Sequence, residues 1–499
     1  MIAARRLRRV SSVLGPVLKW FSAVFSVPIA TALYHGTSVV PFLVPLGLSF
    51  GAGALAEWIG GDSELTVQDG FLLVTLTWVL VSLLGSVPYL LSGTGSFATP
   101  INAIFESFSG FSATGSTILL DISVEKHGAA CMLWRQLTQW IAGMGILALA
   151  VAVLPRLSAG GAQFLDAEVP GPRLERLTPH IAETARRLWL LYIGCSVVLL
   201  VLLLGVHYAG LAPRMTPYQA LAHVFTTIPS GGFSPQARSI EAFAPAVQWI
   251  LVPFMFVAAM NFTLLWQAIV STPTAPARDT EFRVYLSVFA VGSLLVSAML
   301  WGNGQFAGLE DTLRHGTFQT ATLLTTTGYA STDFAVWSEE VLVVLLLLMF
   351  ASGCVGSTSG GLKLMRWTVG FKVIGRELFQ MIHPSSVRPM WLGRRTVKEP
   401  VVRGILIVIL TYLLLVVGGT GFIAVDAHRV GIDLSISEAL SGTLVVLGNI
   451  GPGFGAVGPM GGFEALPVPT KVFMCLLMVA GRLEVMTFLV VLSPSYWRG

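Results

Sequence analysis

The chain has few charged residues for its length. Asp, Glu, Lys and Arg make up 11% of its 499 residues, whereas hydrophobic residues make up 54%. A typical soluble protein contains about 25% charged residues, because its surface must be hydrated. So little charge excludes a soluble fold of this size and indicates that the protein is solvated by a lipid bilayer.

Cysteine and histidine are also scarce. The four cysteines (positions 131, 195, 354 and 475) have neither metal-ligand spacing nor the spacing of a disulfide framework. The eight histidines form no close cluster. A membrane-embedded enzyme would need a nucleophile with its base, or a set of metal ligands. We therefore predict no enzyme activity and no covalently bound cofactor.

Long apolar stretches are abundant. A spanning helix needs about 20 apolar residues, and ten stretches qualify. They are Val13–Leu33, Val39–Ile59, Phe71–Leu91, Met132–Leu154, Leu188–Val206, Val247–Val270, Val284–Trp301, Val341–Trp367, Ile405–Val425 and Val472–Leu492. With a cytoplasmic N-terminus, most of the 30 Lys and Arg residues fall inside, as the positive-inside rule requires. The net charge of +4 follows from this topology and gives no sign of nucleic-acid binding.

The outer connections share a pattern. Four times, a connection holds an apolar segment too short to cross, which ends in small or hydroxyl residues and a glycine. The four ends are Ser112-Ala113-Thr114-Gly115, Ser230-Gly231-Gly232-Phe233, Thr326-Thr327-Gly328-Tyr329 and Asn449-Ile450-Gly451-Pro452. Internal repeats of this kind are strong evidence about architecture. We predict an all-α integral membrane protein with four span–pore-loop–span repeats around one central pore, plus two N-terminal transmembrane helices.

The expected boundaries follow from these repeats. They are residues 1–64 for the N-terminal extension, 65–157 for repeat 1, 158–278 for repeat 2, 279–385 for repeat 3 with an intramembrane gating loop, and 386–499 for repeat 4. Thr99-Pro100 and Thr216-Pro217 place a capping hydroxyl before a first-turn proline, and Ser435 with Glu438 forms a capping box. Each short helix then points its negative carbonyl end toward the membrane midplane, which favours a cation.

Backbone chemistry accounts for the glycines. Non-helical chain at membrane depth must be buried or line water. Aiming successive carbonyls at one axis needs dihedral angles that glycine adopts readily, and rings of carbonyl oxygens can replace the hydration shell of an ion. The expected ligands are the carbonyls of Thr114, Gly115, Ser230, Gly231, Thr326, Thr327, Asn449 and Ile450. Four glycine-rich outer turns without function are the alternative, which repetition in register disfavours.

These segments resemble the selectivity filters of the Trk/Ktr/HKT potassium transporters, most closely those of the bacterial TrkH type. Further resemblance lies in Pro179–Ala185, Gly356–Lys363 and Gly481–Glu484. The two extra N-terminal stretches fit TrkH rather than the shorter Ktr subunit. The second filter departs from the family, since it reads Pro-Ser-Gly-Gly where Asn-Asn-Ala-Gly is frequent. In this superfamily, glycine at all four key positions goes with a preference for potassium over sodium.

The eighth apolar stretch is interrupted by the small residues Ala351–Gly361, and Arg482 places a charge inside the last stretch, which is costly in lipid. The resemblance implies that both lie below the filter and obstruct the pore. The implied gate residues are Gly353, Cys354, Gly356, Ser357, Thr358, Gly360, Gly361 and Arg482. A structural ion pair with Glu484 is the alternative role for Arg482. We expect little to hold this loop in place and Cys354 to face a wet lower pore.

The resemblance implies potassium uptake across a bacterial inner membrane, driven mainly by the membrane potential, with K⁺ ions in the filter. It also implies a homodimer that docks a TrkA-like ring of nucleotide-binding regulatory subunits, for which the basic segment Lys363–Arg403 is the candidate surface. An obligate K⁺/Na⁺ or K⁺/H⁺ symporter is the alternative. Such coupling calls for a buried titratable pair along the path, and the sequence offers none that is convincing. Glu106, in the first short helix, is interpreted as a structural residue that bonds to nearby backbone, with a direct role in ion binding as the alternative.

Overall fold

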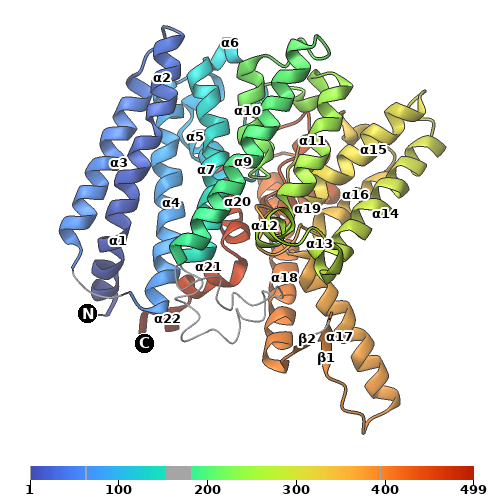
Figure 1. Ribbon diagram of the computed structural model, residues 1–499. Helices are drawn as coiled ribbons and strands as arrows, with labels where there is room; N and C mark the ends of the chain where they lie inside the picture. Colours follow the sequence, from blue (N-terminus) through green and yellow to red (C-terminus); the bar gives the residue numbers. More distant parts are fainter. Residues whose placement is uncertain (1, 62–64, 153–180, 394, 499) are drawn as a thin grey trace.

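The computed structural model describes residues 2–61, 65–152, 181–393 and 395–498, and this part of the chain is almost entirely helical (Figure 1). The expected boundary between repeats 1 and 2 lies outside the described residues, as do Pro179 and His180 of the family motif. Within the described part, the one sheet is an antiparallel hairpin of β1 (Met390–Leu392) and β2 (Arg395–Val397). The all-α membrane class predicted from composition is confirmed.

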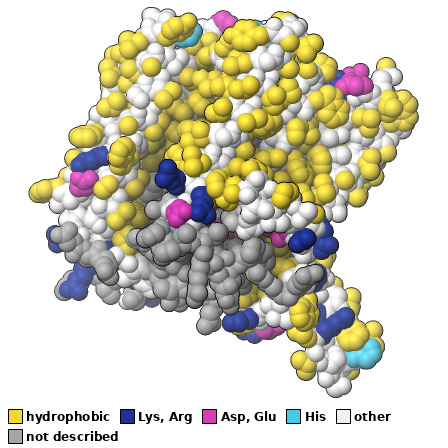
Figure 2. All heavy atoms as spheres, viewed as in Figure 1, with side chains coloured by type: hydrophobic (Ala, Val, Ile, Leu, Met, Phe, Trp, Pro, Cys, Tyr) yellow, Lys and Arg dark blue, Asp and Glu magenta, His cyan; other side chains and the backbone are white. Residues whose placement is uncertain are grey.

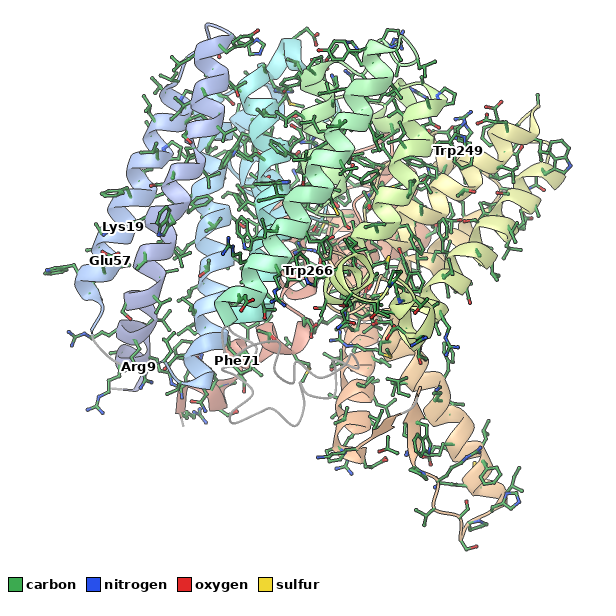
Figure 3. The ribbon with its side chains drawn as sticks, in the orientation of Figure 1. Arg9, Lys19, Glu57, Phe71, Trp249 and Trp266 are labelled. Atoms are coloured by element: carbon green, nitrogen blue, oxygen red, sulfur yellow. The ribbon has the colours of Figure 1, made fainter. Side chains whose placement is uncertain are left out.

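The N-terminal extension forms one flank of the molecule (Figure 1). It consists of α1 (Ile2–Val24), α2 (Ser26–Tyr34) and α3 (Val40–Ile59). Helices α1 and α3 pack closely because a Cβ on Gly15 would lie only 2.8 Å from the carbonyl oxygen of Gly53. Lys19 and Glu57 point toward one another across the same interface and form an ion pair (Figure 3).

The rest of the chain repeats one unit, which contains a first helix, a short pore helix and a second helix. Repeat 1 contains α4 (Val67–Ser92), α5 (Pro100–Phe111) and α7 (Ala129–Ala152), and repeat 2 contains α9 (Ile181–Tyr208), α10 (Pro217–Thr227) and the pair α11 (Pro245–Ala258) and α12 (Phe262–Val270). Repeat 3 contains α14 (Thr280–Gly302), α15 (Leu309–Leu324) and the pair α16 (Glu339–Phe350) and α17 (Leu364–Ile382). Repeat 4 contains α18 (Glu399–Arg429), α19 (Ile436–Leu447) and the pair α20 (Val468–Arg482) and α21 (Val485–Leu492). Short helices join them: η1 (Gly95–Ala98), α6 (Val124–His127), η2 (Ser239–Ala242), α13 (Ala275–Arg278), η3 (Phe334–Val336), η4 (Gly455–Val457) and α22 (Pro494–Arg498).

Six helices of the described part are long and apolar enough to cross a bilayer, or eight if two bent pairs each count as one span. The other two expected spans correspond to α7 and to α16 with α17. Helix α16 has only 12 residues before its break. Helix α7 carries Arg135, Gln136 and Gln139, which lower its hydropathy. All three are buried inside the protein, so this side of the helix faces protein rather than lipid.

Two of the expected spans are sharply bent. Helices α11 and α12 meet at 104°, and α20 and α21 meet at 120°. The side chain of Asn261 caps α12 by accepting a hydrogen bond from the amide of Leu264 at 3.0 Å. Between α20 and α21, Glu484 has a left-handed φ of 62°. The second helices of repeats 2, 3 and 4 are therefore all interrupted, whereas the sequence predicted an interruption only in repeat 3.

The surface and the helix starts agree with a bilayer setting. Hydrophobic side chains cover most of the face in Figure 2, and Lys and Arg gather mainly in its lower part. Thr216 caps α10, and Ser435 with Glu438 forms the predicted capping box on α19. The prediction for Thr99 is only half right. Pro100 begins α5, but the Thr99 hydroxyl makes no capping bond.

Candidate functional site

The four pore helices end in the same way. In each repeat, the residue before the filter glycine donates its amide hydrogen to a carbonyl in the last turn of the pore helix. The bonds are Thr114 to Ser109 at 2.9 Å, Gly231 to Thr226 at 2.8 Å, Thr327 to Thr322 at 2.8 Å and Ile450 to Val445 at 2.9 Å. Four segments of different sequence therefore leave their helices along equivalent backbone paths.

The filter glycines form a closed ring with the carbonyls of the next repeat. A Cβ on Gly115 would collide with the carbonyl oxygen of Gly231. A Cβ on Gly232 would likewise collide with the carbonyl oxygen of Thr327, and a Cβ on Gly328 with that of Ile450. A Cβ on Gly451 would lie 3.0 Å from the carbonyl oxygen of Thr114. Each of these positions therefore needs glycine for two reasons: a side chain would clash with the neighbouring repeat, and the backbone has a positive φ. The four expected filter segments meet around one axis.

The backbone angles define a common register. Ala113, Ser230, Thr326 and Asn449 have left-handed φ angles between 52° and 57°, which L-residues adopt at a cost of about 1–3 kcal/mol. Two residues further on, the four glycines have φ angles of 85°, 78°, 81° and 110°. Ala113 is therefore the equivalent of Ser230, Thr326 and Asn449. The expected carbonyl ligands Thr114 and Gly115 stand one residue later than those expected in the other three repeats.

Buried polar side chains tie each pore helix to the chain that follows its glycine. Glu106 accepts a hydrogen bond from the amide of Ile118 at 2.9 Å. At the same helix position in repeats 2 and 3, His223 Nε2 lies 3.1 Å from Ser234 Oγ, and Gln319 donates to Ser331 Oγ at 3.2 Å. The interpretation of Glu106 as a residue that bonds to nearby backbone agrees with this arrangement.

Repeats 1 and 2 are joined by a buried arginine that is paired with a glutamate of its own repeat. Arg135 of α7 is 1% exposed and lies 2.5 Å from the carboxylate of Glu106. Its guanidinium also donates to the carbonyl of Ser234 at 2.8 Å and stands 3.6 Å from the ring centroid of Phe233. One arginine therefore connects the pore helix of repeat 1 to the filter of repeat 2.

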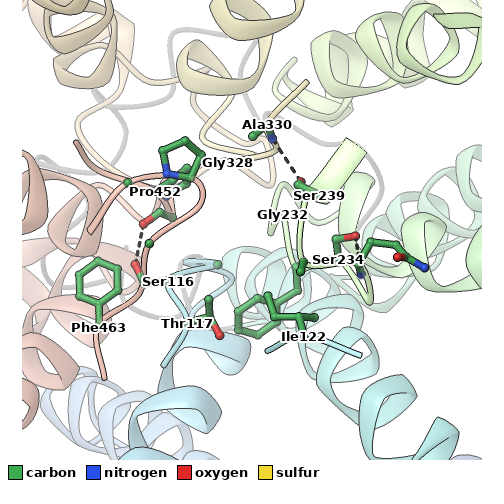
Figure 4. A pocket seen from close by; sticks show the side chains of 18 of the residues that line it. Ser116, Thr117, Ile122, Gly232, Ser234, Ser239, Gly328, Ala330, Pro452 and Phe463 are labelled. Carbon is green, nitrogen blue, oxygen red and sulfur yellow. Dashed lines mark hydrogen bonds between the residues drawn. The ribbon is translucent and has the colours of Figure 1, made fainter. Parts of the chain in front are cut away.

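A pocket lies on the outer side of the ring, and all four filter glycines line it (Figure 4). Hydrogen bonds between repeats close its wall. Ser116 donates to the carbonyl of Gly451 at 2.8 Å, and the amide of Ala330 donates to Ser239 Oγ at 3.2 Å (Figure 4). The pocket is an outer vestibule that leads to the ring of carbonyls.

On the other side, the interrupted segment between α16 and α17 lies directly against the filters. Thr358 Oγ1 lies 3.1 Å from Ser230 Oγ and donates to the carbonyls of Ile228 at 2.9 Å or Ala258 at 3.0 Å. The amide of Gly360 donates to Thr326 Oγ1 at 2.9 Å. The loop of repeat 3 therefore contacts the filters of repeats 2 and 3 from below.

The expectation that little holds this loop is wrong. Its backbone bonds to neighbouring elements: the amide of Cys354 donates to Ala259 at 2.8 Å, and that of Val355 donates to the carboxylate of Glu281 at 2.8 Å. Cys354 is 1% exposed and packs in an apolar cluster with Tyr285. It does not face a wet lower pore in this conformation. Sequence alone could not show these bonds, because their partners lie at the end of α11 and in α14.

Arg482 lies beneath the ring. Its guanidinium donates to the carbonyl of Thr358 at 2.7 Å and to that of Ala142 at 3.1 Å, and the residue is 1% exposed. Glu484, the expected alternative partner, pairs instead with Arg366 at 2.7 Å. Arg482 thus holds the loop of repeat 3 against the second helix of repeat 1.

Sequence reasoning missed the residues that support the filters from behind. His223, Gln319, Arg135 and Gln139 are buried polar residues in helices that lie within the membrane protein. Their presence at a depth where polar groups need partners was the available signal. Their individual partners depend on contacts between repeats, which the sequence does not display.

A helical membrane protein with four pore loops around one axis and a vestibule lined by their glycines belongs to the class of pore-loop transport proteins. Comparison with known proteins gives the family: the model of the TrkH family, described as "cation transport protein", matches residues 46–498. The chain therefore belongs to the TrkH family, and the resemblance seen in the filter motifs is confirmed.

Individual relatives agree over the full length. The chain is 33% identical to the Trk system potassium uptake protein TrkH of Halomonas elongata, with 99% of each chain covered. It is 34% identical to the protein of the same name from Escherichia coli K12, covering 93% of this chain and 97% of the relative. The crystal structure of the potassium transporter TrkH from Vibrio parahaemolyticus superposes with a TM-score of 0.86 at 32% identity, with 99% of both chains covered.

Proposed function

We propose that this protein takes up potassium through the central pore, with K⁺ held by the ring of carbonyls and driven mainly by the membrane potential. The observation that carries the proposal is the closed ring in which each filter glycine stands beside the carbonyl of the next repeat. Such oxygens can replace a hydration shell. Each entering charge gains about 2.3 kcal/mol per 100 mV. Relatives that share the whole chain are potassium uptake proteins.

The loop and Arg482 are proposed as the gate. They lie on the inner side of the ring, and a fixed positive charge there repels a cation on the path. Opening requires Arg482 to release the carbonyl of Thr358, or the loop to move with its anchors on α11 and α14. The interrupted α16 and α17 provide the joint at which such a movement would occur.

A cytoplasmic nucleotide-binding regulatory ring and a second copy of this chain are the proposed partners, in a bacterial inner membrane with the N-terminus inside. Helix α17 and the β1–β2 hairpin project from the body of the protein (Figure 1). Several basic side chains lie on this projection. Arg376 there is held by Glu399 at 2.8 Å. The projection offers a docking surface away from the bilayer.

Ion flux in proteoliposomes tests the proposal. Under an inside-negative voltage, wild-type protein is expected to admit Rb⁺ or K⁺ in preference to Na⁺ without a Na⁺ or H⁺ gradient. In Gly115→Ser, the side chain would meet the carbonyl of Gly231, so the preference is expected to fall. Gly205→Ser, in open space on α9, is the matched control. An absolute requirement for Na⁺ or a proton gradient would instead establish the symport alternative.

A further inference from the structure

Among the described residues, the second filter has a side-chain support that none of the other three filters has. Gln139 of α7 is fully buried, and its amide nitrogen donates to the carbonyl oxygen of Gly231 at 2.7 Å. Its amide oxygen accepts a hydrogen bond from the amide of Phe233 at 3.1 Å. One side chain therefore spans Gly232, the key glycine of this filter, from behind.

The orientation of the Gln139 amide is fixed by chemistry. A backbone carbonyl can only accept and a backbone amide can only donate. A flipped side chain would oppose oxygen to oxygen at Gly231 and nitrogen to nitrogen at Phe233. Gln139 therefore binds this segment in one orientation and holds both backbone groups at fixed positions.

The carbonyl that Gln139 contacts belongs to the ring. Its oxygen faces Gly115, because a Cβ at Gly115 would collide with it. The equivalent ring oxygens are those of Thr114, Thr327 and Ile450. Among the described residues, no side chain donates a hydrogen bond to any of these three oxygens. The ring is thus chemically unequal, with one carbonyl already sharing a lone pair with an N–H group.

Gly231 and Gln139 fit one another. A Cβ at Gly231 would collide with the Oε1 and Cδ atoms of Gln139 and would lie 3.0 Å from its Cβ. Gly231 has an ordinary backbone conformation, since it is absent from the positions with left-handed φ. Glycine is required here for space, and the space is filled by the glutamine. This accounts for two adjacent glycines in the second filter.

We propose that Gln139 is a positioning residue of the filter that sets the preference among alkali cations. It does not contact the ion. Its N–H group fixes the position of the Gly231 carbonyl and reduces the negative charge that this oxygen presents to the axis. Since ion selectivity depends on the number and field strength of coordinating carbonyls, the side chain tunes one quarter of the ring. This inference rests on the proposed function.

The test compares K⁺ and Na⁺ fluxes in proteoliposomes for Gln139→Met, which keeps the length of the side chain but makes neither hydrogen bond. The matched control is Gln136→Met, because Gln136 lies on the same helix, is equally buried and makes no hydrogen bond within the described residues. We expect the K⁺/Na⁺ flux ratio to fall about fivefold in Gln139→Met, the effect of one net hydrogen bond, with Rb⁺ uptake retained. The control keeps the wild-type ratio.

A double-mutant cycle makes the test independent of any one variant. Gly231→Ala should lower the ratio by itself, because its methyl group displaces the Gln139 side chain. In the Gln139→Ala background the two closest atoms, Oε1 and Cδ, are gone and only the 3.0 Å contact with Cβ remains, so the same substitution should have a much smaller further effect. Coupled residues show such non-additivity.

The possible results separate the inference from the function on which it rests. A wild-type protein that does not discriminate K⁺ from Na⁺ contradicts the proposed function. If wild type discriminates and folded Gln139→Met keeps the same ratio, Gln139 does not set selectivity. The inference is also overturned if both Gln139 variants fail to fold while Gln136→Met folds, because Gln139 would then be required for folding alone.

Discussion

Arg135 and Arg482 are equally buried, and the chain treats them in opposite ways. Arg135, beside the outer vestibule, meets the carboxylate of Glu106 at 2.5 Å. Arg482, on the inner side of the ring, bonds to the carbonyls of Thr358 and Ala142, and no acidic side chain of the described residues lies within ion-pair distance of it. Under the proposed function, Arg135 would serve the architecture as a neutralised charge, whereas Arg482 would act on the passing ion as an uncompensated charge. The following predictions test this distinction.

The largest effect is expected at the neutralised arginine. Glu106→Gln leaves the charge of Arg135 buried without a counter-charge, which costs about 3–5 kcal/mol. It also weakens the acceptor for the amide of Ile118. We expect a lower melting temperature in detergent and loss of folded protein. Adding Arg135→Met should recover part of the stability, since a buried pair can be replaced by apolar groups. Wild-type stability in Glu106→Gln alone would contradict the architectural role.

At Arg482, the main effect should be on flux. Two unit charges about 8 Å apart interact by about 2 kcal/mol at an effective dielectric constant near 20. Removing this repulsion lowers the energy barrier to the ion by about that amount. Arg482→Ala is therefore expected to raise resting Rb⁺ flux ten- to thirtyfold. Arg482→Lys keeps the charge and should stay near the wild-type flux. An unchanged or lower flux in folded Arg482→Ala protein would show that the arginine is structural, as Arg135 is.

A smaller effect is expected from the loop to which Arg482 is bound. Thr358→Val keeps the shape of the side chain but removes the hydroxyl that bonds to Ile228 or Ala258. Loss of this hydrogen bond should destabilise the closed position of the loop by about 1 kcal/mol. The resting flux should then rise about fivefold. Ser357→Ala is the control, because the hydroxyl partners of Ser357 among the described residues, Cys354 and Ser359, both belong to the loop itself. Equal fluxes in the two variants would remove Thr358 from the gate.

The smallest effect belongs to an exposed pair. Lys126 lies 2.8 Å from Asp121 on the outer surface, and its hydrogen bond lowers the pKa of the Asp121 carboxyl. Because its pKa is lowered in the folded protein, ionised Asp121 stabilises the fold at pH values above its unfolded pKa of about 3.9. This stabilisation is lost as the pH falls through the folded pKa. Asp121→Asn should lower the melting temperature slightly at pH 7, and by progressively less as the pH falls below about 3.9. A large shift at pH 7 would contradict the view that exposure makes such pairs weak.

The repeats and the filter glycines could be predicted from the sequence because their causes are local. A short apolar segment cannot cross a bilayer, and a backbone position with positive φ favours glycine at that one place in the sequence. The same reasoning identified the interruption before Gly361, where small residues cannot sustain a helix. Each of these features depends on residues adjacent in the chain.

The supporting contacts could not be predicted because they join distant segments. Nothing near Gln139 indicates that it binds Gly231, and nothing near Cys354 indicates that its amide bonds to Ala259. The bends after Ala258 and Arg482 were missed because their flanking residues are apolar enough to read as continuous spans. Similarly, Glu484 was a plausible partner for Arg482 by proximity in sequence, but the fold pairs it with Arg366.

The closed ring of glycines and carbonyls has a consequence for how such a protein can evolve. In an assembly of four identical subunits, one mutation alters all four corners of the ring at once. Here each corner is encoded separately along one chain, so a substitution such as Gly231→Ala changes a single corner. The geometry of the ring can therefore change in small steps while the three unaltered corners keep the ring intact. A second filter that reads Pro229-Ser230-Gly231-Gly232 beside three different segments is the kind of sequence divergence that this arrangement permits.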